Sequence, residues 1–86
     1  MINTDTQPRH RPSDPVAELA GRRFFAWRMA ISCQHSLKEV NQAMAAEHAG
    51  ERRAALAEAD RLLKLEMHHW IQRGEALDII LERLPG

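Results

Sequence analysis

The chain of 86 residues has no tyrosine, a single cysteine and an aromatic content of only 5%. A disulfide needs two thiols and a thiolate metal cluster needs several, so Cys33 can form neither within one chain. We interpret Cys33 as a small buried apolar residue, which is how free cysteines usually behave. Residues suited to strands are scarce, whereas Ala, Leu, Glu and Arg are abundant. The composition therefore predicts an all-α fold.

Neither sign of charge is in excess, because 12 Lys and Arg residues balance 12 Asp and Glu residues. A domain that binds nucleic acid usually carries a basic surplus, so we expect no nucleic-acid partner. A net charge near zero also gives little electrostatic protection against self-association. The charge balance thus favours a defined oligomer.

Long apolar runs are also missing. No segment approaches the roughly 20 apolar residues that cross a bilayer. The N-terminal region lacks the apolar core of a secretory signal, since Asp5, Pro8 and Asp14 interrupt it. We therefore expect a soluble, cytoplasmic protein.

The chain divides into a tail over 1–13, which we predict to be polar and disordered, and a single helical domain over 14–86. Asp14 can cap a helix whose first residue is Pro15, and this helix should run over about 15–48. Its apolar residues recur at steps of three and four, which places them on one side of a helix. They are Ala26, Ala30, Cys33, Leu37, Val40 and Met44.

A second helix should run over about 51–73, after a break at Ala49 and Gly50. Gly50 is suited to ending the first helix in a left-handed conformation, and a short connection predicts an antiparallel hairpin. Gly74 leaves two alternatives open: a kink in one helix, or a turn before a short third helix over about 75–84. The predicted buried stripe of this half is Leu56, Ala59, Leu63, either Glu66 or Met67, Trp70, Gly74, Leu77, Leu81 and Leu84.

The end of the hairpin away from the turn carries more apolar surface than two helices can bury. A turn near Ala49 would place Trp70 level with Arg28 and Met29, and Leu77 near Gly21. Either a third helix or another chain should cover this end, and we predict that the hairpin dimerises into a four-helix bundle. The residues that we expect to bind a protein partner or a second copy are Phe24, Phe25, Trp27, Ile31, Trp70, Ile79 and Ile80.

These features predict a non-enzymatic protein–protein interaction module, such as a small adaptor, chaperone or regulatory subunit. We predict no catalytic residues and no cofactor, because the sequence contains no Gly-rich phosphate loop and no recognisable set of nucleophile and base. The aromatic segment and its neighbouring arginines also allow a second alternative, a helix that lies on a membrane surface, which we rank lower.

A metal-binding protein is the first alternative. Glu66 and His69 form a Glu-x-x-His pair one turn apart, a spacing that di-iron helical bundles use. Such a site needs further carboxylates, and Glu39 and Glu47 lie at other heights along the predicted hairpin. We therefore rank Glu66 and His69 as weak metal-site candidates.

Overall fold

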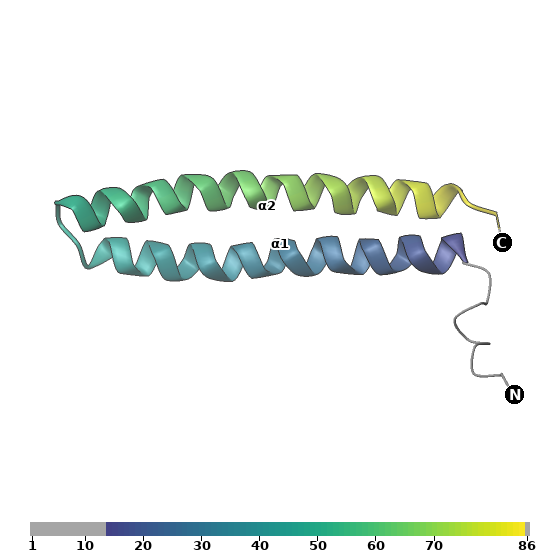
Figure 1. The fold of residues 1–86 in the computed structure, drawn as a ribbon, viewed down its shortest axis with the longest axis horizontal. Coiled ribbons are helices and arrows are strands. Elements are labelled where there is room, and N and C mark those ends of the chain that lie inside the picture. The colour runs from purple at the N-terminus through teal and green to yellow at the C-terminus, as the bar shows by residue number, and fades with distance from the viewer. Residues whose placement is uncertain (1–13, 86) are drawn as a thin grey trace, which may run out of the picture.

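A computed structural model describes residues 14–85 as two long helices joined by a short turn. Helix α1 spans Pro15–Ala45 and helix α2 spans Glu51–Arg83, and they run antiparallel side by side (Figure 1). The described residues contain no strand. The prediction of an all-α helical hairpin is confirmed, while the predicted tail over 1–13 lies outside the described residues.

Helix α1 begins where the sequence indicates. The Asp14 side chain accepts a hydrogen bond from the Val16 backbone N–H at 3.1 Å, and Pro15 occupies the first helical position. Glu18 lies in the first turn, where a negative charge is stabilised by the helix dipole. The helix continues through Gly21, so there is no separate short helix before this glycine.

The first helix ends at Ala45, earlier than the predicted end near residue 48. The backbone N–H of Ala46 donates to the Ala43 carbonyl at 3.1 Å and that of Glu47 to the Met44 carbonyl at 3.0 Å, which closes the last turn. Gly50 has the positive φ that favours glycine, at +103°, but it directly precedes α2 instead of ending α1. The predicted role of Gly50 therefore needs correction: it sets the direction in which the second helix starts.

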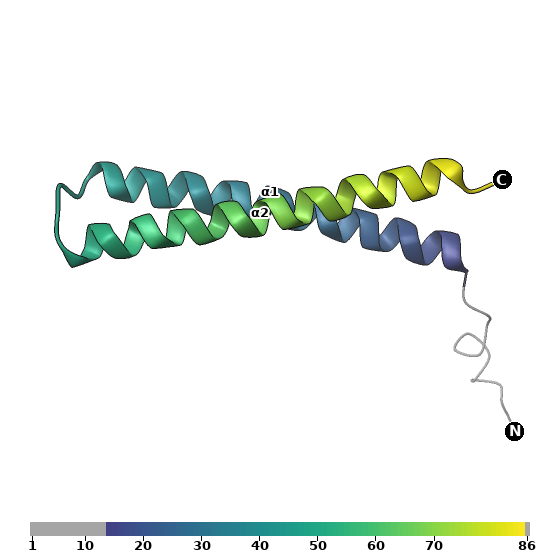
Figure 2. The same cartoon turned by 90° about the horizontal axis from the view of Figure 1, so that it is seen from above.

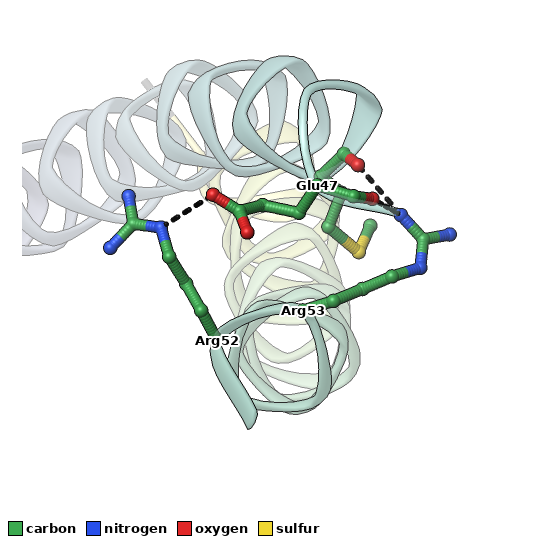
Figure 3. Close-up of polar contacts among 4 residues, drawn as sticks. Glu47, Arg52 and Arg53 are labelled. Atoms are coloured by element: carbon green, nitrogen blue, oxygen red, sulfur yellow. Dashed lines mark hydrogen bonds and ion pairs between the residues drawn. The ribbon is translucent and has the colours of Figure 1, made fainter. Parts of the chain in front are cut away.

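Two arginines hold the turn together (Figure 3). The last carbonyls of a helix have no partner within it. The Arg53 guanidinium donates to the Met44 carbonyl at 2.6 Å and to the Glu47 carbonyl at 2.9 Å. The Arg52 side chain pairs with the Glu47 carboxylate at 3.0 Å. The start of α2 thus supplies the donors that the end of α1 lacks.

Helix α2 runs without a break through Gly74, so the alternative of a short third helix is not what the structure shows. The physical reason lies in the other helix. Gly74 is buried, and a Cβ atom at this position would lie only 2.6 Å from Cε2 of the Trp27 ring. The glycine therefore serves the packing of an indole ring against the α2 backbone and does not end the helix.

Small side chains form the core of the hairpin. The buried hydrophobic residues among those described are Ala26, Ala30, Cys33 and Leu37, with Val40 and Met44 half-buried beyond them. These are the residues of the predicted α1 stripe. Figure 2 shows that the helices cross near their middle and diverge toward both ends. Because three of the four buried residues are alanine or cysteine, most of the large apolar side chains lie outside this core.

Three contacts define how the helices are aligned. Trp27 lies against Gly74, Arg23 pairs with Asp78 at 3.4 Å, and the Asn41 amide donates to Asp60 at 2.9 Å. In each pair the two residue numbers sum to 101. Subtracting the number of an α2 residue from 101 therefore gives the α1 residue at the same height along the hairpin. Trp70 is thus level with Ile31, two to three residues from its predicted position. The difference arises because the hairpin is centred between Gly50 and Glu51.

Candidate protein-binding surfaces

Most of the residues predicted to bind a partner are exposed in the hairpin. The exposed fraction is 66% for Phe24, 52% for Phe25 and 54% for Ile31. It is 49% for Ile79 and 43% for Ile80, while Trp27 and Trp70 are half-buried. Large apolar side chains that are exposed side by side in this way usually mark a surface that another protein covers.

The structure divides these residues between two sides of the hairpin. Successive residues of an α-helix are separated by about 100° around its axis, so Phe24 and Phe25 point in different directions. Phe24, Trp27 and Ile31 line one shallow hollow together with Arg28. We call Phe24, Trp27 and Ile31 the Phe24 face.

The second side carries a groove between α1 and α2. The Phe25 and Trp70 rings meet edge to face in this groove, with ring centroids 5.4 Å apart and planes at 85°. Its remaining lining includes Arg22, Arg73 and Leu77. The groove continues toward the end of α2, where it is lined by Leu19, Ala76 and Ile80 in addition to these same three residues. We call the side of the hairpin that carries this groove the groove face.

The groove is bordered by positive charge. Arg22 and Arg73 line it along its whole length, and neither forms an ion pair with another residue between 14 and 85. Their neighbour Arg23 differs, because it pairs with Asp78. Glu18 and His69 also lie at the groove. An apolar floor between two arginines that form no ion pair among residues 14–85 suits an apolar partner with nearby carboxylates.

The predicted set is therefore not one continuous surface. Phe25, Trp70 and Ile80 share the groove, whereas Phe24, Trp27 and Ile31 share the other face. Ile79 lines none of these hollows. It is adjacent to Ile80, so it points about 100° away from it around the axis of α2. A partner would need to contact two sides of the hairpin to cover all seven residues.

Sequence reasoning missed two exposed leucines. Leu62 is 50% exposed and Leu65 is 58% exposed, and both lie in the half of α2 nearer the turn. They precede His69 by seven and four residues, so they lie on the same side of α2 as the groove. The spacing from His69 is a signal that could have identified them, but Leu62 and Leu65 lie off the predicted buried stripe through Leu63.

Glu66 contacts an aromatic ring and a thiol. The Trp70 indole N–H donates to the Glu66 carboxylate at 3.5 Å, and the His69 ring lies 5.1 Å from the Trp70 ring, edge to face. Burial raises the pKa of the Cys33 thiol, and the charge of Glu66 and a hydrogen bond to it raise this pKa further. Cys33 is buried, as predicted. Among residues 14–85, no three His, Cys, Asp or Glu side chains are grouped as metal ligands.

Comparison of the chain with models of protein families, with curated proteins and with solved structures finds no match. In the part of the chain that the structure describes, neither helix has the length and apolarity needed to cross a membrane. The exposed surfaces are therefore the features from which a function can be inferred.

Proposed function

We propose that this chain is a non-enzymatic protein–protein interaction module that works through the apolar side chains at the open end of its hairpin. An adaptor, a small chaperone or a regulatory subunit would all use such a surface. The observation that carries the proposal is the exposure of Phe24, Phe25, Ile31, Ile79 and Ile80. Fully burying one such side chain contributes about 1.5–3 kcal/mol, so a partner that covers several of them gains a large driving force.

Dimerisation into a four-helix bundle is part of this proposal. Two helices whose buried hydrophobic residues are Ala26, Ala30, Cys33 and Leu37 resemble half of a bundle. Small domains often enlarge a thin core by association, and a two-fold dimer is the commonest form. Binding of a second copy would therefore add to the core that a single hairpin lacks.

The alternatives have less support. A metal site at Glu66 and His69 would need ligands from another chain, because no third ligand lies beside them among residues 14–85. A membrane surface is flat and can contact only one side of the hairpin, while the large apolar residues occupy two sides.

The test combines light scattering with affinity capture, and the metal content is measured on the same chromatographic peak. We expect Phe24→Asp and Phe25→Asp each to weaken association with a second copy or a captured protein by about tenfold or more, because each buries a charge in an apolar contact. Gln42→Asp, at an exposed polar position near the turn and away from the open end, is the matched control, and His69→Ala tests for a bound metal.

A monomer that captures no protein would contradict the proposal, and so would capture that is equal for all variants. A stoichiometric metal that His69→Ala removes would support the metal-binding alternative instead.

A further inference from the structure

The groove on the groove face has the length and shape of a helix-binding site. It runs from Ala17 on α1 to His69 on α2, which lies level with Ser32. A helix rises by about 22 Å, or roughly four turns, over this span of about fifteen residues. The groove is open along its length, whereas sites for small molecules usually surround most of the ligand. The groove thus suits one side of a third helix, which is a common way to bind a segment of another protein.

The floor of the groove is apolar on both helices. The Phe25 and Trp70 rings meet within it, and Leu77 lines it beside them. Toward the end of α2 the groove continues into a hollow that we call the arginine hollow, lined by Leu19, Arg22, Arg73, Ala76, Leu77 and Ile80. No Asp or Glu among residues 14–85 lines this hollow. An apolar side chain and a carboxylate of a partner can therefore be bound there together.

The charges along the groove follow a fixed order. From the open end, Glu18 comes first, Arg22 follows four residues later, and Arg73 lies level with Arg28, a further six residues along. Glu18 lines the groove beside Phe25 but does not line the arginine hollow. Glu18, Arg22 and Arg73 each form no ion pair with another residue between 14 and 85. A helix that lies in the groove therefore meets one carboxylate and then two guanidinium groups, which leaves a net positive charge to be compensated.

We propose that the groove binds an amphipathic helix of a different protein, which places an apolar stripe on the groove floor and carboxylates against Arg22 and Arg73. This inference rests on the proposed function and names the partner of one of its two faces. The levels of the two arginines lie about 9 Å apart along the hairpin, since six residues separate them. Two acidic residues seven positions apart share one side of a helix and lie about 10.5 Å apart. One partner helix can therefore pair with both arginines.

A second copy of this chain fits the groove less well. With the open ends together, the second copy would bring its own Arg22 and Arg73 to the same end of the groove, where like charges disfavour association. Turned end for end, it would place the half of α1 nearer the turn over the aromatic floor. Steps of three and four from Phe25 put small or polar residues on that side of this half, such as Ser36 and Ala43. Neither orientation of a second copy supplies the apolar stripe with carboxylates that the groove complements.

The chain's own segment over 1–13 also matches the groove poorly. It carries Arg9 and Arg11 against a single acidic residue, Asp5. A basic segment would add positive charge beside Arg22 and Arg73 instead of compensating it. The charge of the groove therefore favours a helix supplied by a different protein, and the Phe24 face stays available for a second copy.

The experiment measures how two synthetic peptides bind the full chain, by fluorescence anisotropy. Both probes are amphipathic helices about five turns long, with leucines at steps of three and four. One carries Glu at two positions seven apart beside the leucine stripe, and the other carries Lys at both. We expect the Glu peptide to bind about tenfold or more tightly than the Lys peptide. Arg73→Glu should reverse this preference, because the new carboxylate repels the Glu peptide and attracts the Lys peptide.

Two further variants separate the groove from the rest of the surface. Arg28→Glu is the matched control, because Arg28 is level with Arg73 but lines the hollow of the Phe24 face. This variant makes the same charge change and should leave the preference between the peptides intact. Glu18→Gln removes the one carboxylate of the groove and should tighten binding of the Glu peptide by about twofold. Circular dichroism shows whether each variant keeps its helices.

Equal affinity for the two peptides would overturn the inference, and so would an Arg28→Glu variant that reverses the preference as Arg73→Glu does. No binding of the Glu peptide up to about 0.2 mM, a concentration well above a micromolar Kd, would also overturn it. Binding to vesicles of phosphatidylserine and phosphatidylcholine that Arg73→Glu removes, without peptide binding, would assign the groove to a membrane surface instead. If neither peptide bound while Phe24→Asp still weakened association in light scattering, the proposed function would stand without this partner.

Discussion

The turn end and the open end of the hairpin are held together by different interactions. Near the turn, polar groups join the helices: Asn41 donates to Asp60, Arg52 pairs with Glu47, and Arg53 donates to two carbonyls. At the open end the contacts are aromatic, with Trp27 against Gly74 and Phe25 against Trp70, and Arg23–Asp78 adds one ion pair.

The difference lies in what each end leaves exposed. The large hydrophobic side chains with high exposure are concentrated at the open end, namely Val16, Phe24, Phe25, Ile31, Ile79, Ile80 and Leu84, whereas the half near the turn contributes Leu62 and Leu65. The polar groups of the turn end satisfy one another within one hairpin. The open end is therefore the part of the molecule that would gain most in stability from the proposed association.

The largest effect on stability should come from the open end. Gly74→Ala places a Cβ atom 2.6 Å from the Trp27 ring, so the ring must move, and we expect a loss of about 1–3 kcal/mol in the free energy of unfolding. Gly21→Ala is the matched control, because no atom lies within 4 Å of its added Cβ. It should stabilise the hairpin by about 1 kcal/mol. Urea unfolding at a fixed low protein concentration measures both, and equal effects would contradict the assigned packing.

An intermediate effect is expected at the turn. Arg53→Ala removes the donors to the carbonyls of Met44 and Glu47, and we expect a loss of about 1 kcal/mol in the free energy of unfolding. The apolar surface of the open end is untouched, so dimer affinity should change little. Thermal unfolding followed by circular dichroism measures the first quantity and sedimentation the second. A large loss of affinity would show that the two ends are not independent.

The smallest expected effect is on the stability of the hairpin at low pH. Hydrogen bonds from Lys64 and Asn41 lower the pKa of Asp60, and a hydrogen bond from Arg61 lowers the pKa of Glu58. Their stabilisation is complete above the pKa values of about 3.9 and 4.3 that the two carboxyls have when unfolded, and it is lost as pH falls through the lower folded values. Unfolding midpoints between pH 7 and pH 3 should decline less in Asp60→Asn, and an unchanged decline would contradict this assignment.

Much of this fold could be predicted from residue spacing. The steps from Ala26 to Met44 place one stripe on one side of a helix, and Asp14 with Pro15 gives the start of that helix. The role of Gly74 could not be predicted, because it depends on Trp27, which is distant in sequence. The division of the exposed residues between two faces was also missed, since Phe24 and Phe25 were treated as one surface although adjacent helical residues diverge.

The capped turn has a consequence for the order in which the chain folds. Its contacts join residues close in sequence, such as Met44 and Arg53, so their loop-closure entropy is small. Contacts such as Arg23 with Asp78 close a much longer loop and gain most from structure already formed. We expect the contacts between the two helices to form first near the turn and then progressively toward the open end, which closes last. In the proposed association, a second chain would then bind the open end as it closes, so that association completes folding instead of following it.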